Sequence, residues 1–280
     1  MPAVYVDDPT NLPQIEIPDI QTASERRVMT ITDAPRMLEG AGFEVRRAFA
    51  SIDLALADPF LILDHMGAVE YAPGEAKGAP DHPHRGFETV TYMLEGRMQH
   101  GDSAGNQGDL NPGDVQWMTA GSGVIHEELP HPDFLESGGV MHGFQIWVNL
   151  PAANKMMAPR YQDIPSADIP TIEKDGVWAK VIAGECLGVT AVIDTVIPIS
   201  YIHVKMDAGS ELTQSIDAGL NGMLYVFGGN LKIGEEVVKD GQLVGILFAS
   251  LGFASLGFAS LGFVGVGFVG LGFVGVGFSH

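Results

Sequence analysis

The chain has 280 residues, of which 46% are hydrophobic and only 18% are charged, so its composition excludes a disordered polypeptide. Its formal net charge of −20 opposes contact with the phosphates of nucleic acids, and we expect no direct nucleic-acid binding. The single cysteine, Cys186, excludes an intrachain disulfide, and its apolar surroundings are typical of a small core residue.

The N-terminal segment, up to about residue 33, is polar and contains prolines. It lacks the basic region and apolar core of a signal peptide, which favours a cytoplasmic protein. The 36 glycines and 17 prolines favour many short strands joined by turns. Because no long amphipathic helix is indicated before residue 240, we expect an all-β fold.

The first recognisable strands follow a segment that contains two histidines. The sequence DHPHRG (81–86) precedes residues 87–94, which are rich in β-branched and aromatic side chains and are predicted to form a strand. The sequence NPGD (111–114) favours a type II turn. This turn leads into a further predicted strand over 115–119, shortly before the sequence HEE (126–128).

The spacing of these histidines predicts a metal site. Side chains at positions i and i+2 of a strand point to the same face. If the segments containing His82/His84 and His126/Glu128 are neighbouring strands, three imidazoles and one carboxylate converge on one point. Such a set binds a divalent transition metal and leaves coordination positions open for chemistry. A lone His-x-His is more often a surface loop, but the adjoining strands and turn favour the metal site.

The chain divides into three expected parts. Residues 1–150 form a β-rich first part, 151–243 a proline-rich linker and a second β-rich part, and 244–280 a repetitive tail. In the second part we expect strands over 177–183, 191–196, 199–205, 223–227 and 231–233, with a hairpin turn at 228–230. Seven of the nine histidines lie in the first part, so we expect only that part to bind metal.

The tail repeats ASLGF and then VGVGF with a five-residue period, and residues 241–278 contain no charged side chain. A membrane segment is one interpretation, but the glycines weaken a helix and no basic flank is present, so we do not expect a membrane partner, although the tail leaves one open. A square β-coil is another interpretation, but the repeats are too few for such a coil to be stable alone. We favour an irregular tail, and each interpretation makes it prone to aggregation.

Several stretches together resemble the pirin family. The stretches that carry the resemblance are 60–65, 80–92, 111–123, 125–128 and 143–151. The resemblance is dense from about residue 25 to 170, weaker to about 243 and absent from the tail. It implies a bicupin fold, in which two antiparallel β-barrels of cupin type follow one another. The second barrel is expected to be incomplete, because the repeat replaces the closing motif of the family.

The resemblance also implies a mononuclear iron site. The ligand pattern of the family falls on His82, His84, His126 and Glu128, the same four residues that the spacing selects. We therefore expect Fe(II), with Mn, Ni, Cu or Zn as alternatives. In the wider cupin superfamily, a glutamate shortly after the His-x-His is often a ligand. Here that residue is Glu88, which we rank below Glu128 because the intervening glycine can shift the register.

Two functions follow from the resemblance, since some pirins are quercetin 2,3-dioxygenases and others are redox-sensitive regulators. We expect a metal-dependent dioxygenase that opens the ring of a flavonol such as quercetin with O₂, with Glu128 as the general base. The alternative is an iron-dependent redox-sensing regulatory protein that binds a protein partner without turnover. A metal-free cupin resembling sugar epimerases would leave the four polar side chains without a cation. The residues expected as apolar walls of the pocket, or simply as barrel core, are Phe60, Met66, Met118 and Phe144.

Overall fold

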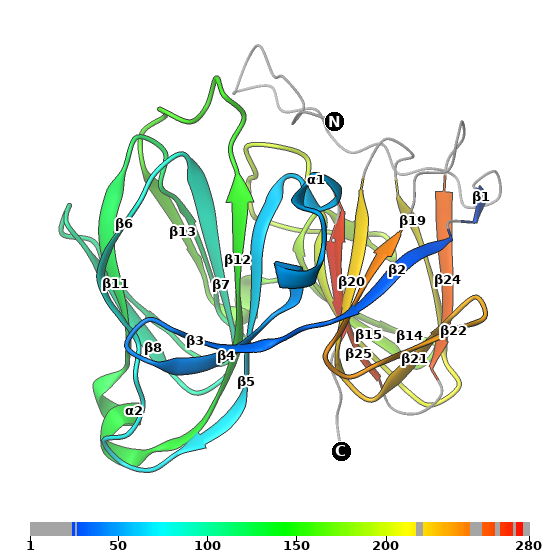
Figure 1. Cartoon of the computed structure of the whole chain (residues 1–280), viewed down its shortest axis with the longest axis horizontal. Coiled ribbons are helices and arrows are strands. Elements are labelled where there is room, and N and C mark those ends of the chain that lie inside the picture. The colour runs from blue at the N-terminus through cyan, green and yellow to red at the C-terminus, as the bar shows by residue number, and fades with distance from the viewer. Residues whose placement is uncertain are drawn as a thin grey trace.

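The structure, a computed structural model, describes residues 24–25, 27–216, 221–246, 254–260, 264–270 and 273–276. It consists mainly of strands arranged as two β-barrels of cupin type side by side, which confirms the expected fold class (Figure 1). The helices are short: the 3₁₀ helices Ala48–Ser51 and Ser166–Asp168, α1 (Leu54–Ala57) and α2 (Pro132–Ser137). Among the described residues, no helix is long and apolar enough to cross a membrane.

The first barrel is built from eleven strands. They are β3 (Arg36–Glu39), β4 (Phe43–Arg47), β5 (Phe60–Tyr71), β6 (Ala79–His84), β7 (Phe87–Glu95), β8 (Met98–Asp102), β9 (Gln107–Leu110), β10 (Val115–Thr119), β11 (Val124–Pro130), β12 (Gly139–Asn149) and β13 (Arg160–Ile164). One sheet has the order β13-β10-β7-β12-β5-β4-β3 and the other the order β6-β11-β8-β9. The strands predicted over 87–94 and 115–119 are confirmed as β7 and β10, and β13 lies within the proline-rich linker.

The second barrel takes strands from both ends of the chain. They are β1 (Ser24–Glu25), β2 (Val28–Asp33), β14 (Thr171–Lys174), β15 (Val177–Ala183), β16 (Glu185–Cys186), β17 (Val189–Thr190), β18 (Tyr201–Met206), β19 (Glu211–Ile216), β20 (Gly222–Gly228), β21 (Asn230–Ile233), β22 (Glu236–Lys239), β23 (Gln242–Ile246), β24 (Ala254–Ser260), β25 (Val264–Gly270) and β26 (Phe273–Val276). The larger sheet has the order β14-β15-β18-β25-β26-β20-β23-β2.

Four of the five strands predicted in this part are confirmed as β15, β18, β20 and β21. The strand predicted over 191–196 is wrong. There, side chains of β13 make hydrogen bonds to the backbone that a neighbouring strand would otherwise make. Arg160 and Gln162 donate to the Asp194 carbonyl, and the Asp194 amide donates to Gln162 Oε1. The hairpin at 228–230 is also wrong, because β20 and β21 belong to different sheets and β21 pairs with β22.

The tail contributes three strands to the second barrel. β24 pairs with β19 and β21, whereas β25 and β26 lie between β18 and β20. The described part of the tail is therefore regular strand rather than irregular, although β26 runs parallel to β18 and β20. The remaining repeat residues lie outside the described part of the chain.

A continuous hydrophobic core joins the two barrels. It contains Val90 and Trp117 of the first barrel together with Tyr201 and Tyr225 of the second. A separate core fills the second barrel and includes Cys186, whose side chain is fully buried. Burial raises the pKa of the Cys186 thiol to about 12, which confirms a core residue rather than a reactive thiol.

Candidate metal centre

Strands β6 and β11 bring three of the predicted ligands together. They pair antiparallel, with His82 opposite His126, and the side chains of alternate residues share one face. The nitrogens that His82, His84 and His126 offer lie within 4.8 Å of one another. Among the described residues, this is the one such group of three histidine, cysteine or acidic side chains, so the structure brings together the three histidines that the spacing selected.

The imidazoles of this cluster are suited to bind a metal. Both ring nitrogens of His126 and Nε2 of His84 are buried and have no hydrogen-bond partner among the described residues. His82 Nδ1 donates to the carbonyl of Pro80 at 2.8 Å, which leaves Nε2 available and fixes the ring. Burial, followed by the neighbouring His126, lowers the pKa of His84 to about 4, and burial also lowers the pKa of His126. The imidazoles of His84 and His126 are therefore neutral near pH 7, as ligands must be.

Glu128 lies beside this cluster, and two side chains of the facing sheet hold its carboxylate. Thr91 Oγ1 donates to Glu128 Oε1 at 2.8 Å, and Gln145 Nε2 donates to Oε2 at 2.7 Å. The residue is 5% exposed, and it lines the same cavity as His82 and His84. Its negative charge raises the pKa of His126 against the effect of burial, so it is close enough to interact electrostatically.

Glu88, the alternative ligand, points elsewhere. Gly86 adopts a φ of +78°, which breaks the alternation between the His-x-His and the strand that follows. Glu88 is fully buried and accepts a hydrogen bond from Thr119 Oγ1 at 2.6 Å. It therefore shares the face of Val90 and Tyr92, which pack in the core between the barrels. Burial raises the pKa of its carboxyl to about 7.

A row of polar side chains crosses the inner face of the large sheet opposite the histidines. The register places Arg47 of β4 opposite Asp64 of β5, Asp64 opposite Gln145 of β12, and Gln145 opposite Thr91 of β7. The row continues to Gln116 of β10. Sequence reasoning missed these residues. The available signal was a polar residue at an inward position of an otherwise apolar strand, as in residues 60–66 and 144–148.

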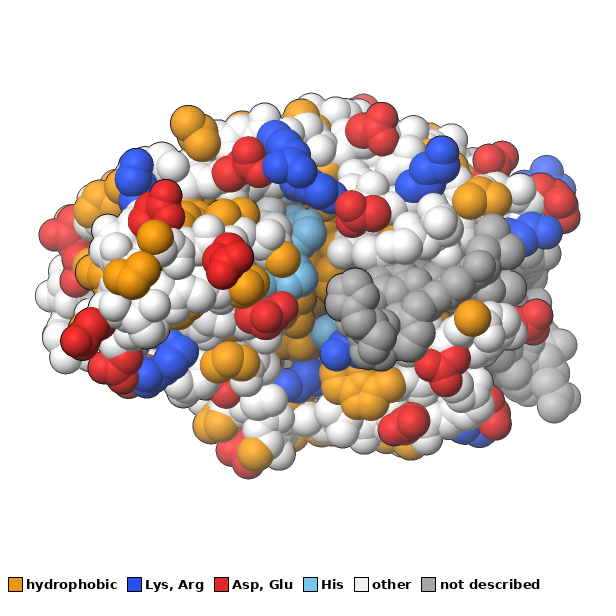
Figure 2. Space-filling model, turned by 90° about the horizontal axis from the view of Figure 1, so that it is seen from below, with side chains coloured by type: hydrophobic (Ala, Val, Ile, Leu, Met, Phe, Trp, Pro, Cys, Tyr) orange, Lys and Arg blue, Asp and Glu red, His pale blue; other side chains and the backbone are white. Residues whose placement is uncertain are grey.

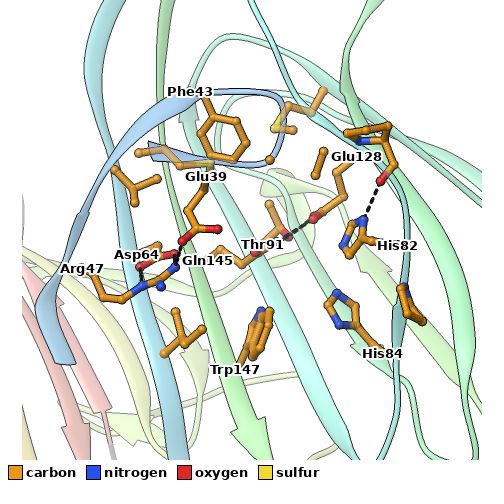
Figure 3. A pocket seen from close by; sticks show the side chains of 18 of the residues that line it. Glu39, Phe43, Arg47, Asp64, His82, His84, Thr91, Glu128, Gln145 and Trp147 are labelled. Carbon is orange, nitrogen blue, oxygen red and sulfur yellow. Dashed lines mark hydrogen bonds and ion pairs between the residues drawn. The ribbon is translucent and has the colours of Figure 1, made fainter. Parts of the chain in front are cut away.

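A cavity of about 590 Å³ lies between this row and the histidines (Figure 3). Its apolar walls include Phe43, Ile62, Met66 and Trp147. Of the four wall residues expected from the sequence, only Met66 lines it. The other three are barrel core: Phe60 and Phe144 lie on the outer face of the sheet, in the core between the barrels, and Met118 packs against Ala120 and Val124.

A second histidine pair, His65 and His142, lines a pocket that residues of both barrels form. Figure 2 shows histidine side chains in a hollow of the surface. Nε2 of His65 and Nε2 of His142 are 2.9 Å apart, and His65 Nδ1 lies 3.1 Å from the hydroxyl of Tyr225. These groups satisfy one another, unlike the buried nitrogens of His84 and His126. Arg85 is exposed and donates to Met156 Sδ at 3.3 Å, so the structure shows no carboxylate partner for it among the described residues.

Comparisons with known proteins agree with this geometry. The family model of pirin matches residues 42–148. Pirin of Rattus norvegicus is 42% identical over 215 residues, which cover 76% of this chain and 70% of the relative. A pirin-like protein of Caulobacter vibrioides is 41% identical over 216 residues, 76% of each chain. The crystal structure of a quercetin 2,3-dioxygenase from Acinetobacter baumannii superimposes with a TM-score of 0.81 at 31% identity, over 88% of this chain and 86% of that one.

Proposed function

The chain belongs to the pirin family, and we propose that it is a metal-dependent dioxygenase that opens the ring of a flavonol such as quercetin with O₂. The observation that carries the proposal is the position of the three histidines and Glu128 at one end of an aromatic-walled cavity large enough for a three-ring substrate. The similarity to a solved quercetin 2,3-dioxygenase supports the same reaction class.

The residues present fit a metal ion. The buried nitrogens of His84 and His126 have no hydrogen-bond partner among the described residues, a costly arrangement unless a cation completes it. We propose that His82, His84 and His126 hold the ion, with Glu128 as the fourth donor, and that the ion is Fe(II). Bound there, it would supply the Lewis acidity and the O₂ chemistry that ring opening requires.

The protein's own groups bind and orient the substrate. A carboxylate oxygen of Glu128 accepts the proton of the flavonol hydroxyl, as a general base within the cavity. Thr91 and Gln145 restrict that carboxylate to one orientation, so that it is already positioned when the substrate arrives. Trp147 and Phe43 lie along the cavity walls, where their rings contact the aromatic substrate and exclude water (Figure 3).

Quercetin turnover by the iron-loaded protein tests this proposal. We expect loss of the flavonol absorbance together with release of carbon monoxide, and neither in His126→Ala. Iron-loaded protein that leaves quercetin unchanged and releases no carbon monoxide would contradict the proposal.

A further inference from the structure

The end of the cavity remote from the histidines is not apolar but carries an ion-pair cluster of Glu39, Arg47 and Asp64 (Figure 3). We infer that this cluster is a second recognition subsite, which binds the hydroxyl groups on the phenyl ring of the substrate while its chelating oxygens face the histidines. The inference rests on the proposed function and adds the feature of the substrate that the cavity selects.

The cluster is built rigidly into the cavity wall. Arg47 Nε donates to Asp64 Oδ1 at 2.8 Å and Nη2 donates to Asp64 Oδ2 at 2.6 Å, a bidentate pair. Nη2 also donates to Glu39. The Asp64 side chain is 7% exposed, and those of Arg47 and Glu39 are 22% and 36% exposed, so the cluster keeps one side open to the cavity.

The cluster retains both donors and acceptors for a ligand. Arg47 Nη1 makes no hydrogen bond to any residue in the described part of the chain, and Glu39 uses only Oε1 to accept from Arg47. Each carboxylate oxygen can accept more than one hydrogen bond. A hydroxyl group, which donates and accepts at once, matches this combination better than a group that only donates or only accepts.

The charge of the cluster selects neutral hydroxyls over anions. One guanidinium is paired with two carboxylates, so the cluster carries a net negative charge. A sulfate, phosphate or carboxylate on the substrate would be repelled, whereas a phenolic O–H donates readily to a carboxylate. Two adjacent hydroxyls on one ring can hydrogen-bond to Glu39 and Arg47 at the same time.

The distance between the ion-pair cluster and the side chain that holds Glu128 fits an elongated aromatic molecule. Arg47 lies on β4, two strands away from Gln145 on β12, which contacts Glu128. With neighbouring strands about 4.8 Å apart, this separation is about 10 Å. Ile62 and Trp147, which lie opposite each other on β5 and β12, provide an apolar surface along the way. A three-ring flavonol spans such a distance with its phenyl ring at the cluster.

Two flavonols that differ only in the phenyl hydroxyls test the subsite: quercetin, which has two, and galangin, which has none. Dissociation constants are measured by tryptophan fluorescence on metal-loaded protein without O₂, so that binding is separated from turnover. The variants are Glu39→Ala, which changes a partly exposed side chain, and Asp64→Asn, which keeps an acceptor for Arg47. The matched control is Glu44→Gln on β4, a residue that pairs with Arg36 and is not among those lining the cavity.

We expect the wild-type protein and Glu44→Gln to bind quercetin roughly tenfold to a hundredfold more tightly than galangin, the usual effect of hydrogen bonds to charged groups. In Glu39→Ala and Asp64→Asn this preference should fall at least several-fold while galangin affinity is unchanged. Equal affinities in the wild type, or a preference unchanged in both variants, would overturn the subsite alone. If neither flavonol binds, the proposed function fails and the subsite fails with it.

Discussion

The two barrels share an architecture but differ in what fills them. The first contains the cluster of His82, His84 and His126, of which the last two are buried, together with Glu128 and a row of polar side chains around a cavity. The second is filled by aliphatic residues such as Val204, Leu224 and Val244. Its one described histidine, His203, lies at the junction, where Nδ1 is 2.7 Å from the hydroxyl of Tyr92. The comparison shows that the barrel provides a scaffold, and that the inward side chains decide whether it carries chemistry.

The two barrels also differ in whether their buried polar atoms have hydrogen-bond partners. In the first barrel, buried nitrogens of His84 and His126 have no hydrogen-bond partner among the described residues, whereas the carboxylate of Glu128 accepts hydrogen bonds from Thr91 and Gln145 of the facing sheet. In the strands of the second barrel, the buried side-chain atoms without a hydrogen-bond partner among the described residues are Thr32 Oγ1 and His203 Nε2. We therefore expect substitutions in the first barrel to change metal binding and substitutions in the second to change stability.

The largest expected effect comes from removing a histidine of the first barrel. His126→Ala should lower metal affinity at least roughly a hundredfold, because it deletes one of the three proposed histidine ligands, while the apolar core keeps the protein folded. His203→Ala, the matched control at the junction, should leave metal affinity unchanged. Competition with a chelator measures both affinities, and circular dichroism confirms folding. Equal loss of metal in the two variants would show that the barrels do not divide these roles.

A substitution that creates a cavity in the core of the second barrel should lower stability and leave metal binding unchanged. Leu224 is fully buried among aliphatic side chains, so Leu224→Ala should reduce the free energy of unfolding by about 2–5 kcal/mol. Metal content per folded chain should not change. Urea denaturation with metal analysis of the folded fraction tests both statements, and a variant that loses metal in proportion to stability would contradict them.

The buried carboxyl of Glu88 should make stability depend on pH. Burial raises its pKa to about 7 from the ordinary 4.5. Between these values the folded state keeps a proton that the unfolded state has lost, so the contribution of Glu88 to stability is present below pH 4.5 and is lost as the pH rises through 7. Relative to wild type, Glu88→Gln should gain about 2–3 kcal/mol at pH 8 and little at pH 5. Thermal unfolding at both pH values measures this difference, and an equal gain at both would contradict it.

The smallest effect should come from a side chain that acts through Glu128. Gln145→Leu removes the donor to Oε2, and we expect metal affinity to fall roughly tenfold to a hundredfold. The matched control is Gln116→Leu, in the same row but bonded to Asp163 rather than Glu128. Isothermal titration with the metal distinguishes them. Equal effects in the two variants would mean that Gln145 stabilises the barrel rather than positioning Glu128.

The sequence predicted what depends on local spacing. The i, i+2 pattern identified His82 and His84, and β-branched runs identified strands such as β7 and β15. The polar row was not predictable, because Arg47, Asp64 and Gln145 become neighbours only through the register of strands that are not consecutive in the chain. The wall residues were misassigned for a related reason, since alternation gives two faces without saying which one lines the cavity.

The metal content of the purified wild-type protein, measured by inductively coupled plasma mass spectrometry after expression with iron, tests the central claim most directly. We predict one iron per chain, lost in His82→Ala, because three converging imidazoles are present in the first barrel and not in the described part of the second. Two metal ions per chain, or iron retained by His82→Ala, would contradict the division between the barrels. A protein without metal would contradict the site itself.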